Sequence, residues 1–384
     1  MTIKFWPSLQ HIACVRIAQG ILYTFDLEHL KRSLLGGLQN TEYIEPITKK
    51  IFEIVLPAYC ATFSRSTAAR KSSEEAKFVH LPPQIKRQLG GVIFSLGLEI
   101  KLWYECHRFI ERNYNLDLRN KLSWFSFGVI DRLETARNFT QDEDFYIGHR
   151  FHLACKYCFD DDVQMLWRNM SMSDRINAMK LIPRTRSIDL YLKTLHGKIS
   201  RNWTEISRNE RRSFFLGNSI GIRSYFTKLR GPKLKYLCIC FAFGSGMAHQ
   251  YDIYSCISLL KDAELNDMLT RMSTTELCEL FKNFLRWPFQ TMFLDIVNDF
   301  QRYIDKDIFY CVVQFILNYK LGMGFEDHMY IKNFERFWNL FSSKYEDGFK
   351  KEVALYALAE YVLESSKDYD AEQYRHLVDV YFPD

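Results

Sequence analysis

Two histidines and two cysteines follow one another at intervals of three residues, at positions His149, His152, Cys155 and Cys158. Imidazole and thiolate groups are the usual ligands of structural zinc, which binds them in a tetrahedral arrangement. The surrounding residues predict a helix, on which each step of three residues rotates the side chain by about 60°. Four such side chains spread over half the helix surface and cannot converge on one ion. We therefore expect no metal and no cofactor here, and we interpret the four residues as packing residues.

A redox role for the pair formed by Cys155 and Cys158 requires an electropositive helix N-terminus. The pair instead lies late in its predicted helix, so we do not favour that role. The three acids of residues 160–162 suit the start of the next helix, where the helix dipole stabilises negative charge. This interpretation explains them without a bound cation.

A Gly-x-Ser-x-Gly pattern spans residues 217–221 and places Ser219 at its centre. In serine hydrolases of the α/β type, this pattern joins a strand to a helix and exposes the nucleophile. No alternation of strands and helices is evident around Ser219, and the chain has only 17 glycines among 384 residues. Hydrolysis through Ser219 is therefore an alternative hypothesis. Its candidate acids and bases are Asp295, Asp299, His328 and His376.

Basic residues dominate the segment 198–235, where ten lysines and arginines stand against two acids. The segment thus carries a net charge of +8 and the rest of the chain −3, which together give the chain's net charge of +5. Such a segment can bind nucleic-acid phosphates, an acidic protein or acidic residues of the same chain. We favour the last two over nucleic acid. The candidate binding residues are Arg208, Arg211, Arg212, Lys228, Arg230, Lys233 and Lys235.

The composition favours helices and a location inside the cell. Aromatic residues make up 16% of the chain, and glycine is scarce. The N-terminal residues lack the order of charges and apolar residues of a signal peptide. No run approaches the roughly 18 apolar residues that a membrane span needs. We expect the ten cysteines to be reduced and the protein to be cytoplasmic, although a nuclear location is also compatible.

Segments with the apolar period of a helix follow one another along the chain. Their predicted ranges include 10–23, 84–113, 118–137, 275–285, 288–303, 307–321, 327–341, 346–363 and 370–381. Several segments are preceded by a Ser or Thr that lies three residues before an acid, as in a helix capping box. These residues are Thr140, Ser171, Ser207 and Ser273. Their spacing fits a repeat of 33 to 36 residues, which is typical of stacked helical hairpins.

Residues 149–170 resemble an ankyrin repeat. The run 152–155, His-Leu-Ala-Cys, is similar to the His-Leu-Ala-Ala of that family, and Val163 and the run 165–167 stand at its aliphatic positions. His149 and Arg150 depart from its Thr-Pro, and Cys158 occupies the position of the glycine between its helices. The resemblance implies one helix pair of ankyrin-like type. It implies nothing about the family's binding loops.

Together these features predict an all-α fold, with antiparallel helix pairs stacked as an α-solenoid-like array. We expect an N-terminal helical portion at 1–61, a polar linker or mobile loop at 62–83 and a helical-repeat body at 84–384. Stacked helix pairs commonly bind other proteins. The leading hypothesis is thus a non-enzymatic protein-interaction scaffold. The basic segment suggests that its protein partner is acidic. Hydrolysis through Ser219 and nucleic-acid binding through 198–235 remain the alternatives.

Overall fold

The computed structural model describes residues 3–24, 55–57, 78–80, 82–107, 121–181, 186–197, 215, 217–322, 329–365 and 369–382. Of the predicted linker, residues 62–77 and 81 lie outside these ranges, as do Arg208, Arg211 and Arg212 of the basic segment. No helix in the described ranges has both the length and the apolar character that crossing a lipid bilayer requires.

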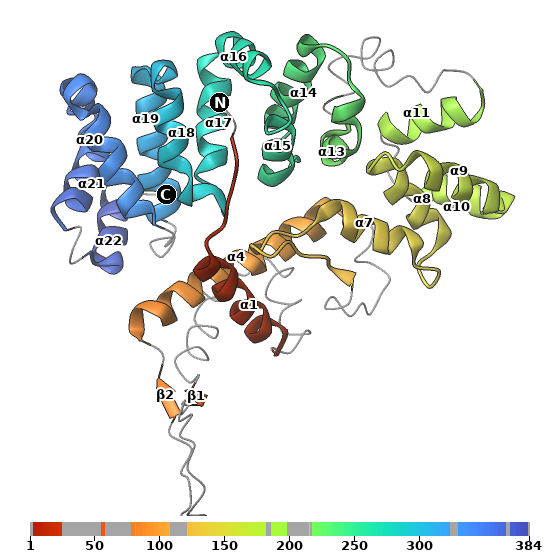
Figure 1. Cartoon of the computed structure of the whole chain (residues 1–384), viewed down its shortest axis with the longest axis horizontal. Helices are drawn as coiled ribbons and strands as arrows, with labels where there is room; N and C mark the ends of the chain where they lie inside the picture. Colours follow the sequence, from red (N-terminus) through yellow and green to blue (C-terminus); the bar gives the residue numbers. More distant parts are fainter. Residues whose placement is uncertain are drawn as a thin grey trace, which may run out of the picture. The chain divides into compact units, whose positions relative to one another are not determined.

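The fold is all-α, as predicted, apart from one short strand pair (Figure 1). Strands β1 (Val55–Pro57) and β2 (Phe78–His80) pair antiparallel, with Leu56 opposite Val79. The contacts divide the chain into two units. One comprises residues 8–101, and the other comprises residues 1–7 and 102–384.

The smaller unit contains helix α1 and most of helix α4. Helix α1 (Leu9–Thr24) confirms the predicted helix at 10–23, and it buries Val15, Ala18 and Leu22 along one face. Helix α4 (Pro83–Cys106) continues through Gly90 and Gly91 without a break, and the boundary between the units falls inside it. Its buried residues Leu89, Ile93, Leu96 and Ile100 follow the helical period.

The larger unit is an array of helices, whose bounds are α7 (Arg132–Gln141), α8 (Ile147–Lys156), α9 (Asp160–Asn169), α10 (Met172–Leu181), α11 (Arg186–Leu195), η1 (Ser219–Gly221), α13 (Ile222–Tyr225), η2 (Phe226–Lys228), α14 (Pro232–Ser245), α15 (Gln250–Ile257), α16 (Asp262–Arg271), α17 (Thr274–Phe284), η3 (Phe289–Thr291), α18 (Phe293–Phe300), η4 (Gln301–Tyr303), α19 (Lys306–Gln314), the π-helix η5 (Phe315–Leu321), α20 (Tyr330–Phe349), α21 (Val353–Glu364) and α22 (Ala371–Tyr381).

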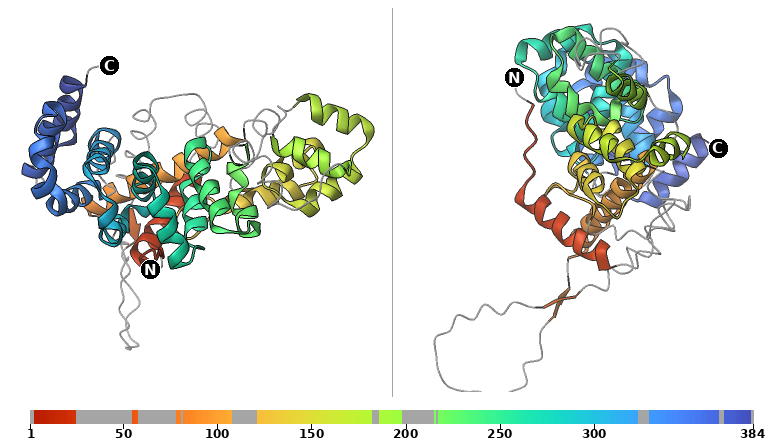
Figure 2. Two further views of the ribbon diagram at one scale, coloured as in Figure 1. Left: turned by 90° about the horizontal axis from the view of Figure 1, so that it is seen from above. Right: turned by 90° about the vertical axis from the view of Figure 1, so that its right-hand side faces the viewer.

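Helices in this array pack against the next helix and often against the one after it (Figure 2). Thus α17 contacts α18 and α19, α18 contacts α20, and α20 contacts α21. A helix that is covered by two neighbours buries a face wider than a narrow stripe. In α20, Phe334, Phe337, Trp338 and Phe341 are all buried, and their intervals of three and four residues form one broad apolar face. The array therefore buries its aromatic residues between successive layers of helices.

Capping boxes begin two of these helices, as predicted. The amide of Asp174 donates to Ser171 Oγ (3.1 Å), and the amide of Ser171 donates to a carboxylate oxygen of Asp174 (3.2 Å). Ser273 and Glu276 make the same reciprocal pair at 3.3 and 2.8 Å. Each box satisfies amides that the first turn of a helix leaves without intrahelical partners. Ser207 lies outside the described residues.

The prediction for Thr140 is wrong. Thr140 lies inside the last turn of α7, and its hydroxyl donates to the carbonyl of Ala136 at 2.8 Å. A threonine that bonds back one turn in this way is a helix-interior residue and not a cap.

The predicted helix at 118–137 is also wrong over residues 122–131. These residues form a turn with an isolated bridge between Trp124 and Ile130, and α7 begins only at Arg132. Gly128 has a φ of 85°, a left-handed value that a helix does not accommodate. Further along, α20 extends eight residues beyond the predicted end at 341, because it buries Phe349 completely.

Buried polar side chains join neighbouring hairpins by donating to backbone carbonyls. Tyr330 donates to Leu285 O (2.8 Å), and Asn333 donates to Gln290 O (2.7 Å). Farther along, Tyr374 donates to Leu317 O at 3.1 Å. Buried carbonyl groups need such partners, since leaving them unpaired is costly. These bonds fix the connections between helices of successive hairpins.

Candidate functional site

The N-terminal segment 3–7 is extended and alternates its side chains between the protein and the solvent. Ile3 is 4% exposed and Phe5 is half-buried, whereas Lys4 is exposed and Trp6 is 81% exposed. A period of two is the geometry of an extended strand. By its contacts, the segment belongs to the same unit as the helical array (Figure 1). It therefore presents one apolar face to that unit.

Phe5 lies among three aromatic rings that come from distant parts of the chain. Its ring centroid is 5.2 Å from that of Phe127, 5.2 Å from that of Phe289 and 6.5 Å from that of Tyr254. All three interplanar angles lie between 83° and 85°, so the contacts are edge-to-face. This geometry brings the positive edge of one ring to the negative face of another. We call Phe127, Tyr251, Tyr254 and Phe289 the aromatic site.

The segment is also held by its backbone. The amide of Phe5 donates to the hydroxyl of Tyr254 at 2.7 Å. Burial raises the pKa of that hydroxyl, and the hydrogen bond from Phe5 opposes the effect. The phenol therefore stays protonated at neutral pH and retains its capacity to accept from an amide. One residue of the segment thus makes both a ring contact and a backbone contact.

A tight turn supplies Phe127 to the aromatic site. The amide of Phe125 donates to Val129 O at 2.8 Å, and the amide of Gly128 donates to Phe125 O at 3.1 Å. The rings of Phe125 and Phe127 stack in parallel, with centroids 5.2 Å apart. The left-handed backbone of Gly128 closes this turn, and a residue with a Cβ is strained at that φ.

Helices α15 and η3 supply the rest of the site. Tyr251 and Tyr254 are three residues apart on α15 and therefore lie on one face of that helix. Phe289, in η3, is fully buried, with its centroid 4.6 Å from that of Tyr254. This packing holds Tyr254, whose hydroxyl accepts the hydrogen bond from the Phe5 amide.

Arg223 connects the turn to α15 by charge and by ring contacts. Its guanidinium lies 3.3 Å from Asp131 and 3.5 Å from Asp252, and it stands over the ring of Tyr251 at 5.4 Å. Burial alone lowers the pKa of Arg223, but the two carboxylates raise it by more than that, so the net shift of the pKa is upward. Burial raises the pKa of Asp252, although Arg223 opposes that shift. The ion pair therefore offsets part of the cost of burying the carboxylate, whose pKa remains raised.

Three further hydrogen bonds connect the turn to α17. Trp287 Nε1 donates to Gly128 O at 3.3 Å, and Gln250 Nε2 donates to Trp287 O at 3.0 Å. Asn283 Nδ2 then donates to Gln250 O at 3.3 Å. Since Asn283 and Gln250 are buried, the bond between them is shielded from water, and the three bonds together hold the site as a defined arrangement.

Ser219 lies in the short helix η1 and is 2% exposed. The described residues beside it are turn or helix, so the strand that a nucleophile elbow needs is not found there. No hydrogen bond joins Ser219 to Asp295, Asp299 or His376, all of which the structure describes as exposed. His328 lies outside the described residues. The geometry thus gives no support to hydrolysis.

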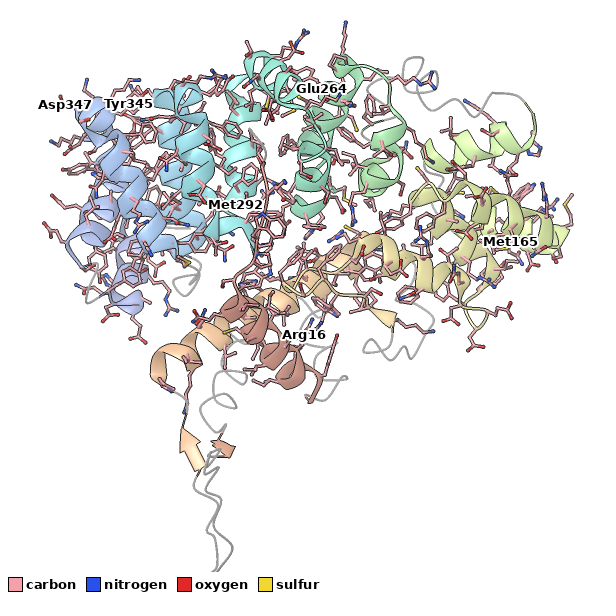
Figure 3. The ribbon with its side chains drawn as sticks, viewed as in Figure 1. Arg16, Met165, Glu264, Met292, Tyr345 and Asp347 are labelled. Atoms are coloured by element: carbon pink, nitrogen blue, oxygen red, sulfur yellow. The ribbon has the colours of Figure 1, made fainter. Side chains whose placement is uncertain are left out.

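Two of the predicted basic binding residues pair with acids of the same chain. Lys228 Nζ lies 3.0 Å from Asp160, and Lys235 Nζ lies 2.9 Å from Glu264, which Figure 3 labels. Arg230 and Lys233 are exposed. This intramolecular pairing is one of the three interpretations that the charge pattern leaves open. It removes two cations from the set available to a phosphate backbone.

The histidines and cysteines of 149–158 pack in the interior. His152 Nε2 lies 3.1 Å from Ala178 O, and Cys158 has a φ of 56°. The amide of Phe159 donates to Ala154 O, which with this left-handed residue ends α8 in a Schellman motif. Burial raises the pKa of Cys155, and raises that of Cys158 to about 12. Both thiols are protonated at neutral pH, which does not favour a nucleophilic role.

Comparison with models of known protein families gives no match, and searches among curated proteins and among solved structures give none either. The function must therefore be argued from this chain's own residues. No motif in the sequence indicates the aromatic site. Trp6 is apolar, so residues 3–6 show no alternation of apolar and polar residues in the sequence, and the rings that receive Phe5 become neighbours only in the folded array.

Proposed function

We propose that the protein is a non-enzymatic interaction scaffold built from helix pairs, and that its aromatic site binds an extended peptide segment of a protein partner. The observation that supports this most directly is the bound state of the chain's own residues 3–7. They occupy the site in extended form, with Phe5 as the buried ring.

The contacts of Phe5 define what a partner must supply. Its ring meets the edges or faces of three aromatic side chains, and its amide meets an acceptor hydroxyl. A peptide in the same pose needs an aromatic residue with a free backbone N–H. It also needs an apolar residue two positions earlier, at the place of the buried Ile3. An aromatic anchor in a desolvated cluster is a common source of binding energy.

The ion pairs and hydrogen bonds around the site make it rigid before a peptide arrives. Arg223 holds the turn that carries Phe127, and Gln250 and Trp287 connect that turn to the next hairpin. A preorganised site loses less conformational entropy on binding. The same contacts explain why this site can be specific although it consists mainly of aromatic rings.

The chain's own segment acts as a competitor. A tethered segment has an effective concentration on the order of millimolar, so a partner peptide must exceed that competition to displace it. The exposed cation of Lys233 supports a preference for acidic groups elsewhere on the partner. The free cysteines among the described residues support a cytoplasmic, reducing location.

A peptide-display selection tests this proposal. The full chain carrying Phe5→Ala, which vacates the ring position, is immobilised and presented with random heptapeptides. We expect enrichment of peptides with an apolar residue, any residue and then Phe, Tyr or Trp. The matched control is the double variant Phe5→Ala and Phe127→Ala, which should lose this enrichment. Equal enrichment on both surfaces, or none on either, would show that the aromatic site is not a peptide-binding site.

A further inference from the structure

Two lysines stand over aromatic rings in the larger unit, where the end of α17, the π-helix η5 and the start of α20 approach one another (Figure 1). The ammonium groups of Lys282 and Lys320 lie 5.8 Å and 5.3 Å from the centroid of the Phe315 ring. Lys320 also stands over the ring of Tyr330, at 5.5 Å. Since the face of an aromatic ring attracts a cation at such distances, the two rings hold the two lysines at one place.

Glu279 connects a third cation to this group. Its carboxylate oxygens lie 3.0 Å from Lys282 Nζ and 3.9 Å from a guanidinium nitrogen of Arg286. The second distance is too long for a hydrogen bond. The Arg286 guanidinium has five N–H donors, and it makes no hydrogen bond to the residues that the structure describes. Its side chain is 40% exposed, so a ligand can reach these donors. We call Lys282, Arg286 and Lys320 the cationic cluster.

The cations of this cluster are partly shielded from water and repel one another. Burial and, to a lesser extent, the positive charge of Arg286 lower the pKa of Lys320 to about 7. Burial also lowers the pKa of Arg286, and Glu279 opposes that shift only in part. A negative group bound among the cations would oppose both shifts, because it stabilises the charged forms. The planar guanidinium matches the two oxygens of a carboxylate, which makes an acidic side chain a fitting ligand.

A tight turn connects the cationic cluster to the aromatic site. The amide of Phe289, whose ring belongs to that site, donates to the carbonyl of Arg286 at 2.8 Å. This is the hydrogen bond of a four-residue turn, which holds the two Cα atoms within about 7 Å of each other. An extended peptide covers about 3.3 Å per residue, so a side chain within about four positions of an aromatic anchor can reach Arg286.

We propose that the cationic cluster binds an acidic side chain, Asp or Glu, of the same partner peptide whose aromatic residue occupies the aromatic site. This inference rests on the proposed function and adds the charge that the partner must carry. A peptide fits better than a nucleic acid, because three cations around the carboxylate of Glu279 are too few to neutralise a phosphate backbone. The partner therefore carries an acid within about four residues of its aromatic anchor.

Charge-matched peptides test the proposal on the full chain carrying Phe5→Ala. The labelled peptide with the sequence of residues 2–8 is synthesised with Glu or, as the neutral match, Gln in place of Thr2 or of Ser8, and anisotropy is measured. For one of the two positions, we expect the Glu peptide to bind about tenfold more tightly than the Gln peptide. Adding Arg286→Gln should remove most of this advantage, whereas Arg286→Lys should keep part of it.

A control variant and the failed outcomes complete the test. Lys344→Gln should leave the advantage unchanged, since the Lys344 ammonium also lies over a ring, that of Tyr345 at 4.9 Å. If the Gln peptides bind and Glu adds nothing at either position, or if the advantage survives in Arg286→Gln, the inference is overturned and the proposed function stands. Binding of none of the peptides overturns both. The inference also fails if a thymidine oligonucleotide binds more tightly than the Glu peptides and loses that binding in Arg286→Gln.

Discussion

The backbone amide of Phe5 lies 2.7 Å from the hydroxyl of Tyr254, although the two residues are 249 positions apart in the chain. This contact connects the N-terminal segment to α15 in the middle of the array. Phe5 is thus held in two ways: its backbone amide donates this hydrogen bond, and its side chain packs among aromatic rings.

Tyr254→Phe removes the acceptor for the Phe5 amide and keeps the ring. We expect the segment to be stabilised by about 1 kcal/mol less, because the Phe5 amide loses its acceptor in the protein and must bond to water instead. Hydrogen exchange at the Phe5 amide should then be faster by several-fold. Tyr345→Phe is the matched control, since its hydroxyl bonds Ile304 O elsewhere in the array. Equal exchange at Phe5 in the wild type and in Tyr254→Phe would contradict the assignment.

Arg223→Met removes the cation that faces Asp131 and the buried Asp252. We expect a loss of about 3 kcal/mol in the free energy of unfolding, because a buried carboxylate remains without its partner. The double variant with Asp252→Asn should recover part of the loss, since the unpaired charge is then gone. Urea denaturation is measured for the wild type, Arg223→Met, Asp252→Asn and the double variant. Strict additivity of the two single losses would show that the residues do not interact.

Ser273→Ala removes the side-chain acceptor of the capping box of α17. The expected cost is about 1 kcal/mol in the free energy of unfolding, because the first turn loses a partner for one amide. Thr274→Ala, at the exposed neighbouring position, is the control and should cost much less. The cap assignment fails if thermal or urea denaturation shows the two variants to be equally stable.

Protonation of the buried His152 should destabilise the protein in acid. Burial lowers the pKa of His152 from its usual 6.5 to about 4, and its Nε2–H donates to the carbonyl of Ala178. Since the unfolded chain binds the proton more readily, this contribution is present above pH 6.5 and is lost as pH falls to about 4. The shift corresponds to about 3 kcal/mol.

His152→Gln isolates that contribution, because glutamine donates a hydrogen bond but does not titrate. The free energy of unfolding of the variant should fall less steeply between pH 6.5 and 4 than that of the wild type. Burial also lowers the pKa of His107 and His149, so both chains retain some loss in acid. Parallel pH profiles would show that His152 is not the titrating residue.

The sequence alone predicts most of the helices and two of the caps, because apolar period and capping residues are local properties. The helix at 10–23 and the boxes at Ser171 and Ser273 are of this kind. The turn at 122–131 was missed because contacts made far along the chain determine it: the rings of Phe125 and Phe127 pack on Tyr251. Tertiary packing here overrides a helical pattern.

The candidate site was not predictable for the same reason. Phe127, Tyr254 and Phe289 are far apart in sequence, and each is an ordinary apolar residue in its own segment. The residues that sequence motifs did single out, such as Ser219 and Lys235, have structural surroundings that explain them as buried or ion-paired. Nothing local distinguishes an aromatic residue that receives a peptide from one that fills a core.

Peptide binding to the full chain tests the central claim most directly. A fluorescently labelled peptide with the sequence of residues 2–8 is titrated into the wild type, Phe5→Ala, and the double variant Phe5→Ala and Phe127→Ala, and anisotropy is measured. We predict saturable binding to Phe5→Ala, at least tenfold weaker binding to the wild type, whose own segment competes, and none to the double variant. Equal binding to all three chains, or no binding to Phe5→Ala, would contradict the account.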